Sequence, residues 1–141
     1  MQRGVTFILL LTTVFSQAQD YGFLLKSQEY KLDQFDQNVG LNNPFINTIN
    51  QADNGNLLVG TGEGVGVFDG KNFEMFYTDD HLAENSISSS FKDDVGNIWY
   101  GHQSGGISIF DGVSFDLVHP GGGINSIING IDQDQNGLIW F

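Results

Sequence analysis

Apolar side chains recur along most of this chain at every second position, not at every third or fourth. In Gly64–Phe68 two valines alternate with a glycine and a phenylalanine, and Gly106–Phe110 repeats the arrangement with isoleucines and a serine. Successive side chains of a β-strand face opposite sides of a sheet, whereas a helix buries residues three or four apart. These segments are therefore predicted to be short strands that are buried on at least one face.

Asparagine–glycine and aspartate–glycine pairs mark the links between the predicted strands, as at Asn54-Gly55 and Asp69-Gly70. Because glycine tolerates a positive φ, such pairs favour the tight turn of a β-hairpin. The predicted strands are Ile46–Gln51, Leu57–Gly60, Gly64–Phe68, Asn72–Tyr77, Ile87–Lys92, Ile98–Gly101, Gly106–Phe110 and Ser114–His119. No stretch has the spacing and the caps of a long helix.

The whole pattern repeats with a period of about 41 residues. Three glycines stand 41 residues apart, at Gly55, Gly96 and Gly137. Nine residues before each of them stands an isoleucine, at Ile46, Ile87 and Ile128. Four antiparallel strands in a period of this size are typical of a β-propeller blade. The predicted fold is therefore all-β, with blades that are four-stranded antiparallel meanders.

The repeat also predicts the organisation of the chain. Residues 46–86 form a first blade, 87–127 a second, and 128–141 the start of a truncated third. Because a ring needs four to eight blades, we expect an incomplete ring and an N-terminal piece of a longer protein. In the leading segment 19–45, Tyr30–Phe35 resembles the aromatic outer strand of a blade. It either closes the ring by completing the last blade or is a stray leading strand.

Residues 1–18 have the pattern of a secretory signal peptide. Arg3 supplies a positive start, Val5–Phe15 is an apolar run, and Ser16 and Ala18 are the small residues expected before a cleavage site. A membrane-spanning helix needs about 20 apolar residues, so this run is too short to be a good anchor. We therefore expect export, either to the periplasmic side of a membrane-anchored parent or to the cell surface or medium.

The composition excludes several classes of function. Seventeen acidic residues face five basic ones, for a net charge of −12, which opposes binding of nucleic acid through its phosphates. The absence of cysteine excludes disulfides, thiolate metal sites and a cysteine nucleophile. The chain has no phosphate-binding loop followed by a helix, no serine-hydrolase elbow and no zinc-protease motif. The sequence predicts no catalytic residues in this segment and no cofactor.

The connections between strands point to candidate binding residues. If the Ile46–Gln51 strand is innermost, the longer loops gather on one rim and the tight hairpins on the other. Recognition usually lies on the longer, more variable loops. The candidate ligand contacts are polar residues of these loops: Glu63, Asp79, Asp80, His81, His102, Gln103 and His119. The alternative is that they are solvated loop residues, and that His102 only forms a local hydrogen bond at a strand end.

A metal site is the weaker interpretation of the polar residues. The three histidines lack the paired spacing of metal ligands. Asp132, Asp134 and Asn136 fit the first half of a calcium loop, but the flanking helices of such a loop are absent. An Asn-Gly hairpin explains the same residues. Trp99, Tyr100 and Trp140 also have a binding and a structural interpretation. They stack on a ligand if they are exposed, or they form the core between blades.

The repeat resembles the two-component regulator propeller family, through Asn97–Gly101 (Asn-Ile-Trp-Tyr-Gly) and Gly106–Gly112 (Gly-Ile-Ser-Ile-Phe-Asp-Gly). Leu58 departs from the pattern, since the later copies have tryptophan there. The resemblance extends from about Tyr30 to Phe141. It implies the periplasmic sensor region of a bacterial, often hybrid, histidine kinase, with the membrane helix and the phosphorelay domains beyond this segment.

The resemblance also implies partners for the segment. These are an extracellular small molecule or oligosaccharide, and further propeller blades of the same chain. Nucleic acid is not expected to bind this segment, and contact with the membrane is expected only through downstream regions. Two alternatives stay open: a secreted or surface-attached propeller binding protein without a signalling role, and a propeller lyase resembling streptogramin lyase.

Overall fold

The computed structural model describes residues 34–35, 37–119 and 123–141. The predicted signal peptide at 1–18 lies outside these residues, as does most of the predicted outer strand Tyr30–Phe35. Of that strand, Gln34 and Phe35 are described, and neither has strand conformation. Among the described residues, no helix has the length and the apolar character needed to cross a membrane.

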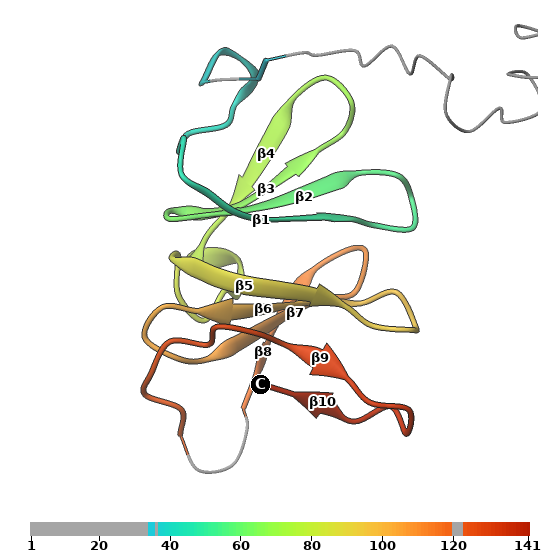
Figure 1. Ribbon diagram of the computed structural model, residues 1–141. Coiled ribbons are helices and arrows are strands. Elements are labelled where there is room, and N and C mark those ends of the chain that lie inside the picture. Colours follow the sequence, from blue (N-terminus) through green and yellow to red (C-terminus); the bar gives the residue numbers. More distant parts are fainter. Residues whose placement is uncertain (1–33, 36, 120–122) are drawn as a thin grey trace, which may run out of the picture. The chain divides into compact units, whose positions relative to one another are not determined.

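Two four-stranded antiparallel sheets make up most of the described chain (Figure 1). The first contains β1 (Ile46–Gln51), β2 (Leu57–Thr61), β3 (Gly64–Phe68) and β4 (Phe73–Phe76). The second contains β5 (Ile87–Lys92), β6 (Ile98–His102), β7 (Ile107–Phe110) and β8 (Phe115–Val118). In both sheets the spatial order of the strands is the chain order, which is the meander of a propeller blade.

The remaining elements are short. Strands β9 (Asp132–Gln133) and β10 (Ile139–Trp140) form an antiparallel pair, and two 3-10 turns occur, η1 (Gln37–Val39) and η2 (Thr78–Asp80). The predicted all-β fold is confirmed, and the described residues form no closed ring. The eight predicted strands are also confirmed, with ends that differ by at most one residue.

The first strands of the two sheets, β1 and β5, lie side by side (Figure 1). The hydrophobic core is formed by side chains from both sheets. Leu58 and Val65 fill it from the first sheet and have no exposed surface. Ile98 and Tyr100, also without exposed surface, fill it from the second sheet. Each sheet is therefore stabilised by its neighbour, because a lone blade leaves this face in water.

A glycine in each sheet allows the next unit to approach closely. A Cβ atom on Gly60 would lie 2.7 Å from Cγ2 of Ile87, and one on Gly101 would lie 2.6 Å from Cγ2 of Ile128. Atoms this close would overlap, so any side chain at either glycine would push the next unit away. Gly60 and Gly101 thus each pack against the first isoleucine of the next unit. This contact, which we call the joint between units, explains why these glycines and isoleucines keep the 41-residue spacing.

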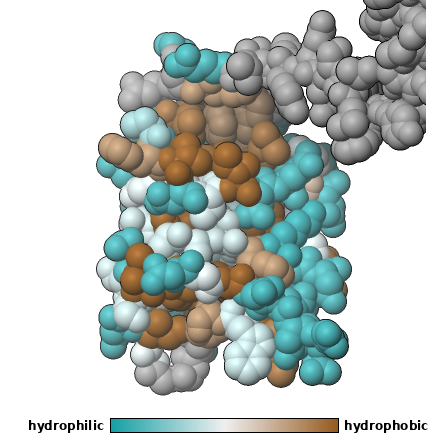
Figure 2. Space-filling model, in the orientation of Figure 1, coloured by the Kyte–Doolittle hydropathy of each residue, from teal (hydrophilic) through white to brown (hydrophobic). Residues whose placement is uncertain are grey.

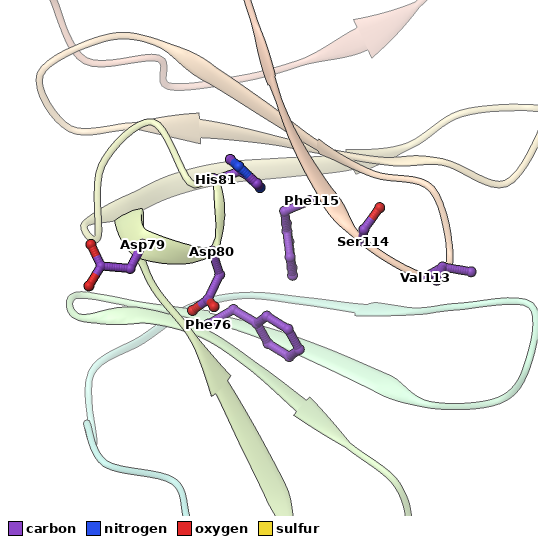
Figure 3. Close-up of a pocket in the computed structure, with 7 residues that line it drawn as sticks. All are labelled: Phe76, Asp79, Asp80, His81, Val113, Ser114 and Phe115. Atoms are coloured by element: carbon purple, nitrogen blue, oxygen red, sulfur yellow. The ribbon is translucent and has the colours of Figure 1, made fainter.

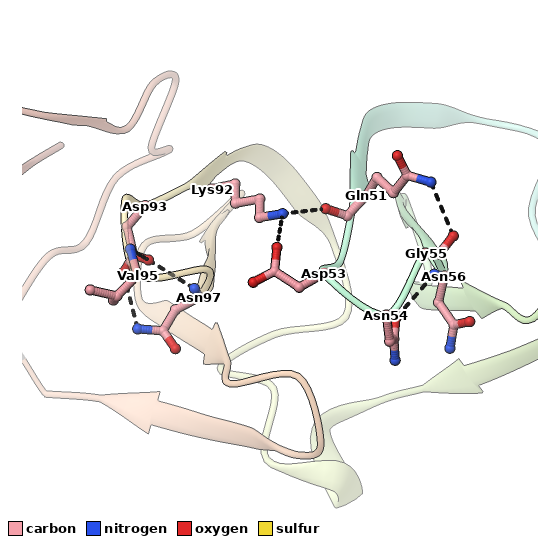
Figure 4. A network of polar contacts seen from close by, with 9 residues as sticks. All are labelled: Gln51, Asp53, Asn54, Gly55, Asn56, Lys92, Asp93, Val95 and Asn97. Atoms are coloured by element: carbon pink, nitrogen blue, oxygen red, sulfur yellow. Dashed lines mark hydrogen bonds and ion pairs between the residues drawn. The ribbon is translucent and has the colours of Figure 1, made fainter.

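Polar contacts between units also recur. The amide of Asn47 donates to the carbonyl of Ile87 at 2.7 Å, and the hydroxyl of Ser88 donates to that of Ile128 at 2.7 Å. At the hairpin ends, Lys92 donates to the carbonyl of Gln51 at 2.9 Å and pairs with Asp53 at 2.6 Å (Figure 4). One period later, Gln133 bonds to Asp94 in the same way, at 3.0 Å.

Asp93 organises the turn between β5 and β6. Its Oδ1 accepts hydrogen bonds from the backbone of Val95 (3.1 Å) and Asn97 (2.8 Å) (Figure 4). Its Oδ2 accepts from the side chain of Asn97 (3.0 Å) and from Nε1 of Trp99 (2.8 Å). Burial raises the pKa of Asp93, but the hydrogen bonds from Trp99, Asn97 and Val95 outweigh burial and hold that pKa below its usual range.

This carboxylate makes stability depend on pH. The pKa of Asp93 is lower in the folded chain than in the unfolded chain, where it is about 3.9. Its stabilisation is therefore complete above that value and is lost as pH falls through the folded-state pKa. We expect the melting temperature of the wild type to fall more steeply below about pH 4 than that of Asp93→Asn. Parallel melting profiles of the two proteins would contradict this expectation.

Candidate functional site

The longer connections contact one another, as is expected if β1 is the innermost strand. The backbone N–H of Gly64 donates to the carbonyl of Asn85 at 2.7 Å, which joins the β2–β3 turn to the β4–β5 loop. Ser104, in the β6–β7 turn, donates its backbone N–H to the carboxylate of Glu84 at 2.8 Å. The longer loops therefore form a connected rim in the described part of the chain. Pro120–Gly122 of the last predicted loop lie outside the described residues.

One pocket of about 250 Å³ contains three of the candidate residues (Figure 3). Asp79, Asp80 and His81 line it from η2 and the residue that follows. Four further residues complete the lining: Phe76, Val113, Ser114 and Phe115. The pocket thus lies where the outer strand of the first sheet, β4, meets the outer strand of the second, β8.

Hydrogen bonds hold the turn that carries these residues. The carboxylate of Asp80 accepts from the backbone N–H of Tyr77 at 2.9 Å, and the N–H of Asp80 donates back to the carbonyl of Tyr77 at 2.9 Å. The backbone of Thr78 is tied to the side chain of Asn85 at 2.8 Å. His81 ends the turn with φ 71, the left-handed conformation that is unusual outside glycine. These contacts fix the positions from which Asp79 and His81 project.

The lining of the pocket limits what it can bind. Phe76 and Phe115 provide apolar ring surface, whereas Asp79 and Asp80 provide carboxylates and Ser114 a hydroxyl. No lysine or arginine contributes to the described lining. Carboxylates accept hydrogen bonds from hydroxyl groups, and they repel an anion bound in the same pocket. The pocket therefore suits a small neutral or cationic polar group with one apolar face.

His102 is a buried residue. It lies in β6 with no exposed surface, and its Nε2 is 2.9 Å from the hydroxyl oxygen of Ser108. That oxygen also accepts a hydrogen bond from the backbone of Ala83 at 2.8 Å. Burial lowers the pKa of His102, and the nearby Glu84 opposes this only in part. The hydroxyl of Ser108 thus joins the β4–β5 loop to His102. The bond of His102 to Ser108 agrees with the local hydrogen bond expected as its alternative role.

The other candidate residues are exposed but lie outside the pocket. Glu63 is in the β2–β3 turn, where its backbone N–H donates to the hydroxyl of Thr61 at 3.0 Å. Gln103 begins the β6–β7 turn, and its N–H donates to the carbonyl of Ser86 at 3.1 Å. His119 follows β8. The structure therefore brings together three of the seven candidates in one pocket, and the described lining of that pocket does not include Glu63, Gln103 or His119.

Sequence reasoning missed Val113, Ser114 and the two phenylalanines. Val113 and Ser114 follow an Asp-Gly hairpin, which the meander places on the opposite rim. The ring centroids of Phe76 and Phe115 are 5.1 Å apart, so the end of β4 meets the start of β8. Sheets twist, and the outer strands of neighbouring blades therefore cross instead of running edge to edge. The repeated aromatic residues were the available signal for this contact.

The residues of the calcium alternative serve the β9–β10 hairpin. Asp134 accepts hydrogen bonds from the backbone of Asn136 (2.8 Å) and Leu138 (3.0 Å) and from Nε1 of Trp140 (3.2 Å). This is the arrangement that Asp93 makes one period earlier. Within the described ranges, no group of three or more ligand side chains could hold a metal ion. Calcium binding by Asp132, Asp134 and Asn136 stays an untested prediction.

The three aromatic residues of the repeated strand have different environments. Tyr100 has no exposed surface and belongs to the core between the sheets, as its core interpretation predicts. Trp99 is half-buried and donates to Asp93. Trp140 is 62% exposed.

The architecture defines the class of fold: the chain forms stacked four-stranded meanders, which is the arrangement of propeller blades. No protein-family model matches the chain, and no curated protein matches it. Among solved structures, it is similar to the extracellular domain of BT3049 from B. thetaiotaomicron, a protein assigned as a hybrid two component system. The TM-score is 0.61, the sequence identity is 27%, and the match covers 80% of this chain. The same match spans 16% of the chain of that extracellular domain.

Proposed function

We propose that this chain is a ligand-sensing segment of a two-component signal transduction protein, on the outer side of the membrane, and that its units belong to the two-component regulator propeller repeat. The observation that supports the proposal is the similarity to an extracellular domain of a hybrid two component system over 80% of the chain. Since the match spans 16% of the chain of that extracellular domain, the kinase, the phosphorelay and the membrane anchor are part of the proposal.

In this proposal the segment binds and does not catalyse. The ligand is a small molecule or oligosaccharide, and the pocket of Asp79, Asp80 and His81 is its contact on this segment. A sugar ring offers hydroxyl groups to the carboxylates and an apolar face to Phe76. Because two carboxylates line the pocket, neutral sugars are expected to bind in preference to acidic ones.

The pocket is tested by titrating the full chain with maltohexaose, cellohexaose and xylohexaose, with oligogalacturonate as the acidic comparison. We expect a neutral oligosaccharide to shift the NMR signals of His81 and Ser114. His81→Asn should weaken that binding at least about tenfold, which corresponds to about 1.4 kcal/mol. Asparagine is chosen because it tolerates the left-handed backbone of this position.

The matched control is His119→Asn, the same substitution at an exposed histidine outside the pocket. It should leave the affinity unchanged. Absence of binding across the panel, or equal loss in both variants, would contradict the assignment of this pocket. The signalling role has its own test, the coding sequence beyond Phe141. About 20 apolar residues followed by a kinase core would support it, whereas a sorting domain would favour a surface-attached binding protein.

A further inference from the structure

The β4–β5 loop, which carries three residues of the pocket, packs on a buried histidine. His102 lies in β6 with no exposed surface, and its Nε2 is 2.9 Å from the hydroxyl oxygen of Ser108 in β7. The same oxygen accepts a hydrogen bond from the backbone N–H of Ala83 at 2.8 Å. Ala83 is two residues beyond His81 of the pocket lining. One hydroxyl group therefore joins the loop of the pocket to the buried ring.

The residues around Ala83 also hold the loop against the second sheet. Leu82 is 2% exposed and belongs to the hydrophobic core. A Cβ atom on Gly106 would lie 2.9 Å from Cβ of Ala83, so the loop touches the backbone just before β7. The carboxylate of Glu84 accepts hydrogen bonds from the backbone N–H of Ser104 at 2.8 Å and from its hydroxyl at 3.3 Å. In Figure 2 the rim of longer loops, at the left, accordingly mixes hydrophobic and hydrophilic residues, whereas the rim of hairpins, at the right, is more hydrophilic.

The fold does not require an ionisable residue at the position of His102. Its counterpart one period earlier is Thr61, which is equally buried. The hydroxyl of Thr61 donates to the carbonyl of Gly64 at 2.9 Å and accepts from the backbone N–H of Glu63 at 3.0 Å. These bonds stay within one hairpin. The bond of His102 to Ser108, by contrast, extends through Ser108 to the preceding loop.

A proton on the ring of His102 would disrupt this arrangement. A neutral imidazole can accept a hydrogen bond at one nitrogen, so the hydroxyl of Ser108 can donate to Nε2 while it accepts from Ala83. An imidazolium donates from both nitrogens and accepts at neither. Nδ1 of His102 is buried without a hydrogen-bond partner, so the charged N–H at this atom would be unpaired. Because an unpaired buried charge is costly, the packed loop favours the neutral ring. The cation is favoured where the loop is displaced and water reaches the ring.

The charges around His102 do not reverse this preference. Within the described residues, β5 contributes Ile87 beside it, β7 contributes Ser108, and the third unit contributes the backbone of Ile128, none of them ionisable. The charged group of the described chain that acts on the ring is Glu84 in the loop, which attracts the cation. Burial outweighs this attraction and lowers the pKa of His102 below its ordinary value of about 6.5. Between the lowered pKa and about 6.5, the displaced loop binds more protons than the packed loop, so acid favours displacement.

We propose that His102, in its neutral form, positions the pocket loop through Ser108 and Ala83, and that acid releases this loop and weakens ligand binding in the pocket. The weakening of binding rests on the proposed function, whereas the release of the loop does not. Because one proton is linked to the release, it lowers the affinity by at most about tenfold per pH unit.

The first test needs no ligand. The full chain is titrated from about pH 7.5 to about pH 4.5, on both sides of the ordinary histidine pKa of about 6.5. NMR follows the ring of His102 and the hydrogen exchange of the Ala83 amide, with exchange rates corrected for their intrinsic dependence on pH. We expect the ring to titrate below about pH 6.5, and the Ala83 amide to lose protection with the same midpoint.

Variants separate the causes of this transition. His102→Gln keeps a polar group beside Ser108 but does not titrate, so the Ala83 amide should stay protected over the whole range. His102→Thr introduces the residue that the first unit has at Thr61, and it should behave in the same way. Ser108→Ala removes the acceptor, so the Ala83 amide should be unprotected already at neutral pH. The matched control is His119→Asn, at an exposed histidine, whose transition should equal that of the wild type.

Three results would overturn the proposal. These are a His102 ring that stays neutral over the whole range, an Ala83 amide that keeps its protection while the ring titrates, and a transition that persists in both His102 variants.

Binding is then measured at both ends of the pH range with maltohexaose, cellohexaose and xylohexaose. For a sugar that binds at the upper end, the affinity of the wild type should fall further in acid than that of His102→Gln. Any contribution of His81 itself is common to the two proteins and cancels in this comparison. Equal falls would refute the link between His102 and the pocket. If none of the three sugars binds, the assignment of the pocket fails, and the transition of the Ala83 amide alone decides the proposal.

Discussion

Phe115→Ala is expected to lower the free energy of unfolding by about 3–5 kcal/mol, the largest effect of any single substitution considered for this chain. The side chain is 2% exposed. Its ring centroid lies 4.8 Å from that of Phe110, 5.1 Å from Phe76 and 5.9 Å from Tyr100. Removing it opens a cavity between the two sheets, and the loss would be a large part of the stability of a small domain.

The measurement is denaturant unfolding of the full chain followed by circular dichroism. Val113→Ala is the control, because this neighbouring apolar residue is 86% exposed and should change the free energy of unfolding by no more than about 0.5 kcal/mol. Equal effects of the two substitutions would show that the sheets do not pack through Phe115.

Asp93→Ala is expected to cost about 2–3 kcal/mol, because it leaves Nε1 of Trp99 and the backbone N–H groups of the turn without an acceptor. Trp99→Leu alone should also destabilise, since the Asp93 carboxylate then loses one of its donors. The double variant should cost less than the sum of the two single variants by about 1–2 kcal/mol, as expected for residues in direct contact.

The first sheet contains a natural version of this double variant. Ala52 and Leu58 stand one period before Asp93 and Trp99, and they are 5% and 0% exposed. Aspartate thus occurs with tryptophan in one unit, and alanine with leucine in the other. Chemical unfolding of the wild type, the two single variants and the double variant gives the coupling energy. Strict additivity would show that the hydrogen bond between Asp93 and Trp99 does not link the two positions.

The strands and their order could be predicted from the sequence because their causes are local. Alternation of side chains and a glycine in each hairpin depend on a few neighbouring residues, and strand ends came within one residue of the structure. The succession of units could be predicted from the 41-residue period, because Gly60 and Gly101 each contact an isoleucine of the next unit.

The candidate site was less predictable because it depends on how the sheets cross. Asp79, Asp80 and His81 share one turn, so their proximity is local. Ser114 reaches the same pocket only through the twist that brings β8 against β4. The surroundings of His102 are similarly non-local, since the Ser108 hydroxyl beside it also accepts a hydrogen bond from Ala83 in the β4–β5 loop. Neither contact leaves a trace in the spacing of residues along the chain.

The joint between units has a consequence for how such a gene grows. Gly60 meets Ile87, and Gly101 meets Ile128, at the same separation along the chain. A tandem duplication of 41 codons therefore copies one such glycine together with one isoleucine that packs on it, wherever the breakpoints fall. Lengthening by copying needs no compensating mutation at the new seam, and the number of units in descendants can change in single steps.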